Sequence, residues 1–498
     1  MFPAVVERLE LNARLFPERL AYDDAARAVS WSAAVEEIAA IDTGLRRAGV
    51  RPGARVGLLL DNSVDSILAL LAVWRGGAVA VVVNPRIDVS AVVEQLATAE
   101  ATVIAAPPSL RDLATSLGTV TGIDVAPDLA ALRTTRPSAE PVVAAPDDHA
   151  LISFTSGTTG KPKGTLMSYR NLAVRGGTYA VAGALCSRDH GLISTPLCMA
   201  GSLNLSLLPY LYGAAACFIT PETAGPALVD IVASRGITTM FMVPVVSRRL
   251  AEAATRAQLA SVRFLMSSGA ELPADLLDDL TDRLGIDVHE AAGTSETAGG
   301  LYITQPERAM HRRSAGRAIG SYWVEIRDPA TGEPVPPETQ GEIVIGGVAV
   351  GVGYLDGGDV LPFPPTGSAT GDIGYQDHDG YVYVTGRIKD TIVTGGQNVY
   401  PIDVEEVLRG IPRVREVVVL GCPDPTWGEA VCAVIVPDGA APEFADIVTR
   451  AREKLAGYQV PKRIAIVDEL PYTTMGKLDR KALKANWQRL DWQSGSGR

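Results

Sequence analysis

Short apolar runs separated by helix-length segments recur through the first 290 residues, and this repetition limits the possible folds most strongly. The runs at 55–60, 78–83 and 102–105 have the length and composition of buried strands. Asn62 is placed to cap the helix that follows the first run. Further units of this kind recur at 212–219, 238–242, 262–266 and 286–289. Repeated strand–helix–strand units predict a mainly parallel sheet with helices on its faces.

The pattern changes in the last third of the chain. From Tyr322 to about Val393, short strands alternate with turns such as Asp379-Gly380, which predicts an antiparallel sheet or a barrel. After Val404 the sequence predicts a helix, a hairpin, a second helix and a last strand, at 404 onward, 416–437, 445–455 and 463–467. This final stretch of about 110 residues has the size of a small separate domain.

The expected fold is therefore α/β with two domains. Residues 1–386 would form a large N-terminal domain of layered α/β sheets plus a small β-barrel-like subdomain. Residues 387–498 would form a small mobile α+β C-terminal domain.

Charge and cysteine content exclude several classes of protein. The chain has 45 basic and 57 acidic residues, a net charge of −12, which argues against nucleic-acid binding through a general basic field. Five scattered cysteines indicate a reducing compartment. The most apolar stretch, 64–83, contains Asp65 and Arg75 and fails as a membrane span. The first residues lack the pattern of a secretory signal, so we expect a cytoplasmic protein without nucleic-acid or membrane partners.

The sharpest local signal is the decapeptide TSGTTGKPKG at 155–164, which follows the strand-like run 150–154. Its glycines allow a tight backbone whose N–H groups converge on an anion, and its hydroxyls and lysines add donors and charge. Pro162 stands where a Walker loop has Ser or Thr, so the loop is of another type. The alternative is that this segment is a mobile surface loop that binds no phosphate. The candidate phosphate-binding residues are Thr155, Ser156, Gly157, Thr158, Thr159, Gly160, Lys161 and Lys163.

Three further charged residues lie in segments that suit nucleotide chemistry. Asp372 follows a glycine in a turn and could accept both hydroxyls of a ribose, or could simply cap the turn. Glu296 lies in a hydroxyl-rich segment and could hold a magnesium ion between phosphate oxygens, or be an exposed glutamate at a helix start. Lys477 follows a flexible glycine and could neutralise two oxyanions in a cleft, or be a solvated lysine.

The decapeptide resembles the phosphate loop of the adenylate-forming superfamily, which includes acyl-CoA synthetases, nonribosomal-peptide adenylation domains and luciferases. Five more segments are similar to the motifs of that family, in the same order: GTSET at 293–297, TGD at 370–372, GRIKD at 386–390, GGQNVYP at 395–401 and GKLDR at 476–480. The resemblance covers nearly the whole chain.

The resemblance implies that the chain binds ATP and magnesium. It implies magnesium binding for Glu296, ribose binding for Asp372 and nucleotide contact for Arg387. The residues that precede the glutamate in the same motif would also contact ATP: Gly293, Thr294 and Ser295.

The resemblance also implies movement of the C-terminal domain. Lys477 is similar to the lysine that the family requires for adenylation, and Lys389 falls at the hinge position between domains. Rotation at the hinge would present Lys477 for adenylation and the 395–401 loop for acyl transfer.

Two positions depart from the family pattern. The family usually has a tyrosine that stacks on adenine where this chain has Ala292, and loss of a ring forgoes about 1–3 kcal/mol of stacking. What covers adenine therefore stays open. Many acyl-CoA and aryl-CoA ligases read PLFH where residues 196–199 read PLCM.

Met199 is adaptable and apolar, and with Ala291 and Ala292 it predicts a roomy apolar pocket for a bulky aromatic or other hydrophobic acid. The alternative is that Cys198 and Met199 are ordinary core residues. The predicted substrate pocket comprises Met199, Ala200, Gly201, Met242, Ser268, Gly269, Ala291 and Ala292.

The expected reaction has two steps. A carboxylate attacks the α-phosphate of Mg·ATP to give an acyl-adenylate, and a nucleophile then displaces AMP. Coenzyme A is the first choice of acceptor, an amine the second and a carrier-protein thiol the third. A ligand-binding pseudoenzyme is the non-enzymatic alternative. The five histidines are isolated, and we expect His289 to be a satisfied core residue.

Overall fold

The computed structural model describes residues 2, 4–133, 136–137, 140–155, 163–356, 359–472 and 478–494, and of Thr155 the main chain only. The chain divides into two compact units. The first comprises Met1–Val324 and Val344–Ser368, and the second Glu325–Ile343 and Ala369–Arg498. The predicted domain boundary at residue 386 and the hinge at Lys389 stay predictions.

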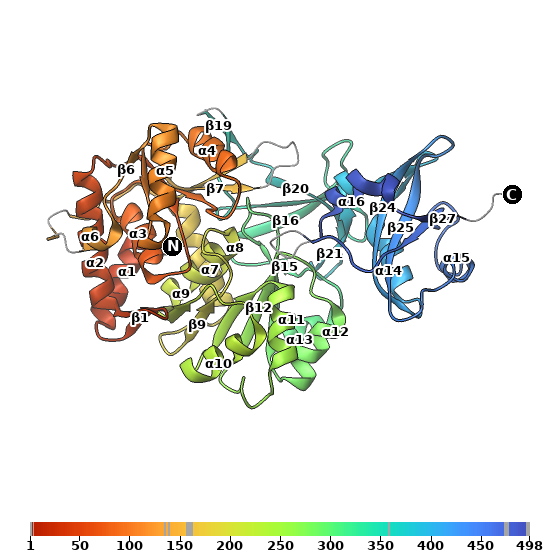
Figure 1. The fold of residues 1–498 in the computed structure, drawn as a ribbon, viewed down its shortest axis with the longest axis horizontal. Coiled ribbons are helices and arrows are strands. Elements are labelled where there is room, and N and C mark those ends of the chain that lie inside the picture. The colour runs from red at the N-terminus through yellow and green to blue at the C-terminus, as the bar shows by residue number, and fades with distance from the viewer. Residues whose placement is uncertain are drawn as a thin grey trace. The chain divides into compact units, whose positions relative to one another are not determined.

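A nine-stranded sheet of the order β15-β14-β13-β12-β11-β9-β10-β1-β2 lies in the first unit (Figure 1). Its strands are β1 (Leu20–Asp23), β2 (Ala28–Ser30), β9 (His190–Ile193), β10 (Ala216–Ile219), β11 (Thr239–Met242), β12 (Phe264–Ser268), β13 (Asp287–Ala292), β14 (Leu301–Ile303) and β15 (Arg317–Ala318). The six strands from β13 to β1 run parallel, which confirms the prediction.

An eight-stranded sheet of the order β19-β18-β8-β7-β4-β3-β5-β6 lies in the same unit. It comprises β3 (Arg55–Leu59), β4 (Val79–Val83), β5 (Val103–Ala105), β6 (Asp124–Val125), β7 (His149–Thr155), β8 (Lys163–Ser168), β18 (Gly353–Asp356) and β19 (Asp359–Pro362). Strands β7, β4, β3, β5 and β6 are parallel, and β8, β18 and β19 are antiparallel additions at one side.

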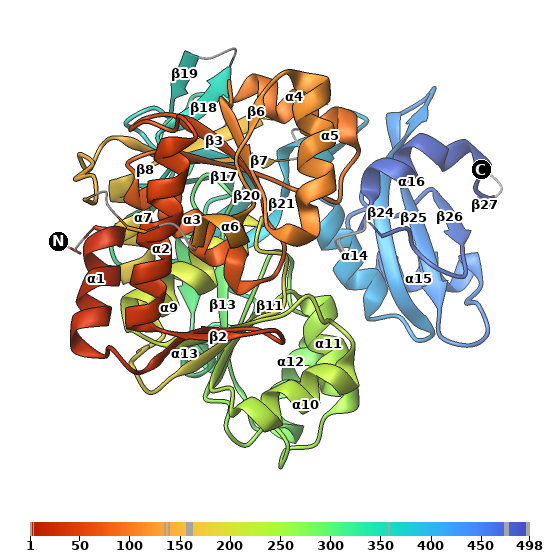
Figure 2. The ribbon, with the colours of Figure 1, turned by 60° about the vertical axis from the view of Figure 1, so that its left-hand side comes forward.

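Helices cover both sheets (Figures 1 and 2). They are α1 (Val5–Leu15), α2 (Trp31–Arg47), α3 (Val64–Arg75), α4 (Val89–Thr98), α5 (Arg111–Thr121), α6 (Leu129–Arg133), α7 (Tyr169–Ala182), α8 (Ala200–Ser202), α9 (Leu208–Gly213), α10 (Gly225–Arg235), α11 (Pro244–Ala253), α12 (Ala274–Asp278) and α13 (Gln305–Met310). Short 3₁₀ or π turns are η1 (Pro108–Leu110), η2 (Leu203–Leu207) and η3 (Asp279–Arg283).

The apolar stretch 64–83 forms α3 and then β4, as expected for a core segment rather than a membrane span. Ser66 to Arg75 are all buried in α3. Within the part of the chain that the structure describes, no helix is both long and apolar enough to cross a membrane.

Ser63, and not Asn62, caps α3, so that detail of the prediction is wrong. The Ser63 hydroxyl accepts a hydrogen bond from the Ser66 amide at 3.2 Å. The Asn62 amide instead donates to the carbonyls of Thr195 (3.0 Å) and Thr220 (2.8 Å). These long-range bonds tie the end of β3 to the segment that leads to Met199.

Between residues 322 and 393 antiparallel pairing appears, as predicted, in β18–β19 and in the pair of β20 (Ser368–Gln376) and β21 (Val382–Arg387). A four-stranded sheet has the order β16-β17-β20-β21, in which β16 (Tyr322–Arg327) and β17 (Gly341–Gly347) are the other two strands. Strands β20 and β21 pair across the turn that contains Gly380, whose φ is +85°.

The last part of the second unit is a six-stranded sheet with helices. The elements are η4 (Ile388–Asp390), β22 (Ile392–Thr394), β23 (Gln397–Val399), α14 (Pro401–Arg409), β24 (Val414–Asp424), β25 (Gly428–Pro437), α15 (Phe444–Arg452), β26 (Arg463–Ile466), α16 (Arg480–Asn486), η5 (Trp487–Arg489) and β27 (Trp492–Ser494). The predicted order of helix, hairpin, helix and strand corresponds to α14, β24–β25, α15 and β26. Apolar side chains of β24 and β25 enter two separate buried clusters, so this sheet is covered on both faces.

Candidate active site

The carboxyl ends of four neighbouring parallel strands, β9, β11, β12 and β13, meet at one edge of the nine-stranded sheet. Met242 ends β11 and pairs with Ser267, while Ser268 ends β12 and pairs with Ala291. Ligands of open α/β sheets bind at this edge. One edge of the sheet therefore holds the strand ends at or next to which five predicted pocket residues lie: Met242, Ser268, Gly269, Ala291 and Ala292.

Alternation along these strands divides the predicted pocket between two faces of the sheet. Phe241 pairs with Met266, and Met242 pairs with the next residue, so their side chains point to opposite faces. Met242 has no exposed surface and packs in the core beneath α10 and α11. Ser268 and Ala291 share the face of Phe241. Ala292, one residue further, shares the face of Met242.

The face of Ala291 carries a buried, mostly aromatic cluster of Tyr179, Leu205, Phe241, Phe264, Met266, Ala291 and Tyr302. Gly201 in α8 lies against it: a Cβ at Gly201 would stand 2.8 Å from Phe241 Cζ. A side chain at this position would require Phe241 to shift, so the α8 segment lies directly against the cluster.

His289 belongs to the same face and is a satisfied core histidine, as expected. Its Nδ1 shares a 2.5 Å hydrogen bond with the Tyr302 hydroxyl, and its ring stacks on Phe264 at 4.7 Å between centroids. Burial lowers the pKa of His289, although Asp287 opposes that shift.

Met199 stands at the start of α8 and is half-buried, next to the half-buried Ala200 and Gly201. Burial raises the pKa of the neighbouring Cys198 thiol to about 11, so this thiol is protonated at neutral pH and poorly suited to be a nucleophile. A π-helical turn, η2, follows α8 directly and contains the buried Asn204.

Glu296 lies in a tight turn after β13. The Thr294 amide donates to the Thr297 hydroxyl at 3.0 Å, and that hydroxyl donates to the Gly299 carbonyl at 2.7 Å. Gly293 has a φ of +149°, and a Cβ there would stand 1.8 Å from the Gly299 oxygen. Only glycine fits this position, which explains the first residue of the motif.

The carboxylate of Glu296 is held by a residue that the sequence motifs did not single out. The Tyr354 hydroxyl donates a hydrogen bond to Glu296 Oε1 at 2.6 Å. Lys163 Nζ lies 5.2 Å from the centre of the Tyr354 ring. Tyr354 thus contacts both the predicted metal ligand and one predicted phosphate-binding lysine.

The predicted phosphate loop begins and ends beside this cluster. Thr155 and Lys163 are cross-strand partners in β7 and β8. Ser156, Gly157, Thr158, Thr159, Gly160 and Lys161 lie outside the described residues.

The donor set around Glu296 fits a magnesium ion. The Thr294 hydroxyl oxygen is buried and has no hydrogen-bond partner in the structure, close in sequence to the Glu296 carboxylate. Magnesium takes oxygen ligands and is commonly held by one or two carboxylates, substrate phosphates and water. Among the described residues, no group of three or more His, Cys, Asp or Glu could hold a metal ion. An ion at Glu296 would therefore need oxygen ligands from the substrate.

The second unit brings Asp372 and Arg387 together. They are direct cross-strand partners on β20 and β21, and Arg387 Nε lies 2.8 Å from Asp372 Oδ1. Burial raises the pKa of Asp372, and Arg387 opposes the shift. Arg387 remains 54% exposed and can still contact a ligand. Lys389 follows in η4 as an exposed side chain.

The 395–401 segment begins with a two-residue hairpin turn. Gly395 and Gly396 have φ values of +56° and +78°, which suits the tight turn between β22 and β23. The Gly395 amide donates to the Trp427 carbonyl at 2.8 Å.

Lys477 lies outside the described residues, but both ends of its loop are fixed. Tyr472 and Leu478 form an antiparallel bridge, and the Asp479 amide donates to the Pro471 carbonyl at 2.8 Å. Arg480, at the start of α16, forms a 2.5 Å ion pair with Glu405.

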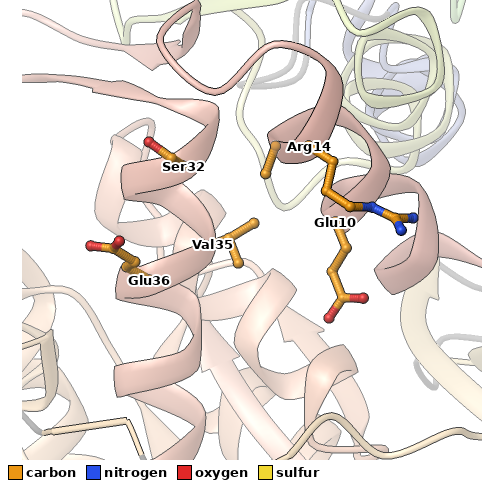
Figure 3. A pocket seen from close by; sticks show the side chains of 6 residues that line it. Glu10, Arg14, Ser32, Val35 and Glu36 are labelled. Carbon is orange, nitrogen blue, oxygen red and sulfur yellow. The ribbon is translucent and has the colours of Figure 1, made fainter.

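Two cavities lie away from the predicted site residues. One, of about 440 Å³, lies between α1 and α2 (Figure 3) and is lined by Glu10, Ala13, Arg14, Ser32, Val35 and Glu36. Another, of about 350 Å³, is lined by Ala184, Cys186, Arg188, Asp189, Thr238 and Arg263.

The chain matches models of two protein families along most of its length. Residues 9–355 match AMP-binding enzymes, and residues 403–477 match the AMP-binding enzyme C-terminal domain. A feruloyl-CoA synthase from Amycolatopsis sp is 33% identical over 481 residues, which cover 94% of this chain and 96% of the relative.

Solved structures agree with this assignment. ATP-bound MatB from Rhodopseudomonas palustris has a TM-score of 0.87 and 27% identity, covering 96% of this chain and 99% of that one. The o-succinylbenzoate CoA synthetase MenE from Bacillus subtilis, in complex with the acyl-adenylate OSB-AMP, has a TM-score of 0.84 and 25% identity, covering 100% of both chains. The chain therefore belongs to the AMP-binding enzymes of the adenylate-forming superfamily and is an ATP-dependent carboxylate ligase.

Proposed function

We propose that the chain activates an aromatic or other bulky hydrophobic carboxylic acid as its acyl-adenylate and then transfers the acyl group to coenzyme A. The observation that carries this proposal is the arrangement in the first unit. The Glu296 turn directly follows β13, and the same strand contributes Ala291 to the buried aromatic cluster. A metal-binding carboxylate and an apolar acid pocket would then adjoin one strand end.

In the first step, a carboxylate oxygen attacks the α-phosphorus of ATP and the bond to pyrophosphate breaks. Magnesium, when bound, neutralises the phosphate oxygens. Glu296 would hold the ion, and Lys163 would add positive charge near the phosphates. Asp372 accepts hydrogen bonds from the ribose hydroxyls, and Arg387 contacts the nucleotide. Lys477 stabilises the two anions as they approach each other.

In the second step, the thiol sulfur of coenzyme A attacks the carboxyl carbon. The bond from that carbon to the AMP oxygen breaks, AMP leaves, and the thiol proton passes to solvent. The adenylate makes this possible, because a free carboxylate is a poor electrophile.

The apolar character of the pocket supports the choice of acid. The buried cluster that includes Ala291 consists of aromatic and other apolar side chains. Met199, half-buried at the start of α8, would add a flexible apolar group. Feruloyl-CoA synthase and o-succinylbenzoate CoA synthetase are both named for acids that carry an aromatic ring. These names also support coenzyme A as the acceptor.

A mass-spectrometric screen tests the proposal. Ferulate, benzoate, anthranilate, hexanoate and acetate would each be incubated with the enzyme, ATP and Mg²⁺, with either coenzyme A or benzylamine. We expect a thioester of at least one aromatic acid. Formation of the amide without the thioester would contradict coenzyme A as the acceptor and indicate an amine instead. Good turnover of acetate with weak turnover of the aromatic acids would contradict the assigned substrate class.

A further inference from the structure

Arg175 on α7 is a fully buried arginine that contacts the main chain of Glu296. Its Nη2 donates a 2.7 Å hydrogen bond to the Glu296 carbonyl, and its Nε donates a 2.7 Å hydrogen bond to the Ala349 carbonyl. The Gly351 amide donates to the same Glu296 oxygen at 2.9 Å. The main chain at Glu296 is therefore fixed from two directions, while Tyr354 fixes the carboxylate.

The same guanidinium contacts the segment that carries the predicted acid pocket. Arg175 Nη1 donates to Asn204 Oδ1 at 3.2 Å, and Asn204 Nδ2 donates to the Ala200 carbonyl at 2.8 Å. Both side chains are completely buried. Two side chains thus connect Glu296 with Ala200, which lies 96 residues earlier in the chain (296 − 200).

Stability alone gives a weak reason for an arginine here. Burial lowers the pKa of Arg175, yet an arginine stays charged in proteins. Its hydrogen-bond acceptors include two carbonyls, one amide oxygen and the Met167 sulfur, and the Tyr322 hydroxyl and the Glu296 carboxylate also favour its charged form. Desolvation of a buried cation is costly, and these partners offset only part of that cost. The arginine has a planar fork that can hold several acceptors in fixed positions at once.

We propose that Arg175 is a positioning residue that couples the acid-binding segment at Ala200 to the metal-binding glutamate. The inference rests on the proposed function, since it assigns acid binding to the α8 segment and metal binding to Glu296. Through Asn204, a change in α8 on acid binding is transmitted to Arg175 and from there to the main chain of Glu296.

Three variants test the two parts of this connection separately. One arm is the hydrogen bond from Arg175 to the Glu296 carbonyl, and the other runs from Arg175 through Asn204 to Ala200. Arg175→Lys keeps the charge but loses the fork, and Arg175→Met removes the charge. Asn204→Ala removes only the arm to Ala200. Adenylation would be followed by pyrophosphate–ATP exchange, with the acid of the above panel that the wild type activates fastest, while acid and Mg²⁺ are varied separately.

We expect both Arg175 variants to raise the KM for the acid and the half-saturating Mg²⁺ concentration, each by about fivefold or more. Asn204→Ala should raise the KM for the acid by a similar factor and leave the Mg²⁺ dependence within twofold. Arg75→Lys is the matched control, because Arg75 is a buried arginine on α3 whose partner is Asp42. It should change neither constant.

The inference is overturned if the Arg175 variants keep both constants within twofold, or if Asn204→Ala shifts the Mg²⁺ dependence as strongly as they do. Should Arg175→Met fail to fold, Arg175→Lys and Asn204→Ala still give the comparison. A wild type that shows no exchange with any acid would overturn the proposed function itself, which is a distinct result.

Discussion

Glu296 shows how much of a site depends on contacts that a motif does not record. The motif names the glutamate, but Tyr354 holds its carboxylate and Arg175 holds its carbonyl. Both partners lie far away in sequence, at 58 residues and 121 residues from Glu296. A glutamate held on both its side chain and its main chain loses little entropy when it binds a metal ion.

Asp372 offers a test of the nucleotide site by a single substitution. We expect Asp372→Asn to raise the KM for ATP by about tenfold, since an amide accepts hydrogen bonds from ribose less strongly than a carboxylate. The KM for the acid should stay within twofold. Steady-state kinetics with both substrates varied would measure this.

The matched control for that substitution is Asp379→Asn, in the exposed turn between the same two strands. It should leave both constants unchanged. An unchanged KM for ATP in Asp372→Asn would show that this carboxylate only pairs with Arg387.

Motif residues could be predicted from the sequence more readily than the residues that support them. The resemblance assigns Asp372 and Arg387 to the nucleotide, and the structure shows them as cross-strand partners. Arg175 and Asn204 were missed because their partners are main-chain carbonyls, which leave no mark in the sequence. The one available signal was the position of Arg175 among apolar residues and glycines in the middle of α7, a helix that also contains Arg170 near its start. Met242 lies in the core beneath α10 and α11, a placement that follows from the alternation along β11 and not from any motif.

The 293–300 turn is the element on which the proposed metal site depends. It follows β13 without a spacer, and three of its residues have left-handed backbone in addition to Gly293: Ala298, Gly299 and Gly300. Such conformations persist only where the surroundings enforce them. The Tyr179 hydroxyl does so by accepting a 2.8 Å hydrogen bond from the Gly300 amide.

Gly293→Ala should therefore disrupt the turn. The positive φ alone costs about 1–3 kcal/mol for a residue with a side chain, and the contact with the Gly299 oxygen adds to this. We expect a lower melting temperature and a loss of adenylation. Gly49→Ala is the control, because Gly49 has a φ of +100° and no atom within 4 Å of the added Cβ. Equal effects of the two substitutions would show that the contact is unimportant.

Strand β13 also carries a pH-sensitive group, His289. Burial lowers its pKa below the value of about 6.5 that holds in the unfolded chain. The unfolded state therefore binds the proton more tightly, and the stability from His289 is present above pH 6.5 and lost as the pH falls. One such group changes the free energy of unfolding by at most about 1.4 kcal/mol per pH unit.

We expect the melting temperature of the wild type to fall more steeply than that of His289→Gln between pH 7.5 and 5.5. Differential scanning calorimetry of both proteins in the same buffers would measure the two slopes. Parallel slopes would mean that His289 is not protonated on unfolding in this range.

Strands were the elements that the sequence predicted best. Each predicted parallel strand is present. A short apolar run bounded by turn residues is too short for a typical helix and is consistent with a buried strand. Nothing in the local sequence marks the π-turn η2, whose Asn204 side chain is hydrogen-bonded to Arg175, 29 residues earlier in the chain. The cap of α3 was misassigned by one residue, because Asn62 and Ser63 are equally good caps in isolation.

At the scale of the whole molecule, the net charge of −12 opposes the binding of ATP. The enzyme must therefore create local positive sites, and its candidates are Lys163, Arg387 and Lys477. Lys163 belongs to the first compact unit and Arg387 to the second. We expect the two half-reactions to use different parts of the second unit, Lys477 in adenylation and the 395–401 loop in acyl transfer.

Lys477→Ala tests that division. We expect adenylation to fall by about 100-fold or more, as is typical when one group that stabilises transition-state charge is removed. Thioester formation from synthetic acyl-adenylate and coenzyme A should stay within threefold. Lys481→Ala, an exposed lysine on α16, is the control and should leave both half-reactions unchanged. Equal losses in both half-reactions would contradict the division.

Acid-dependent pyrophosphate–ATP exchange tests the central claim most directly, because it reports acyl-adenylate formation without any acceptor. Labelled pyrophosphate should enter ATP only when ATP, Mg²⁺ and an acid are all present. Ferulate or another aromatic acid of the panel should support exchange at least about tenfold faster than acetate, a difference of about 1.4 kcal/mol. Absence of exchange with every acid would contradict adenylate formation, and fastest exchange with acetate would contradict the apolar pocket.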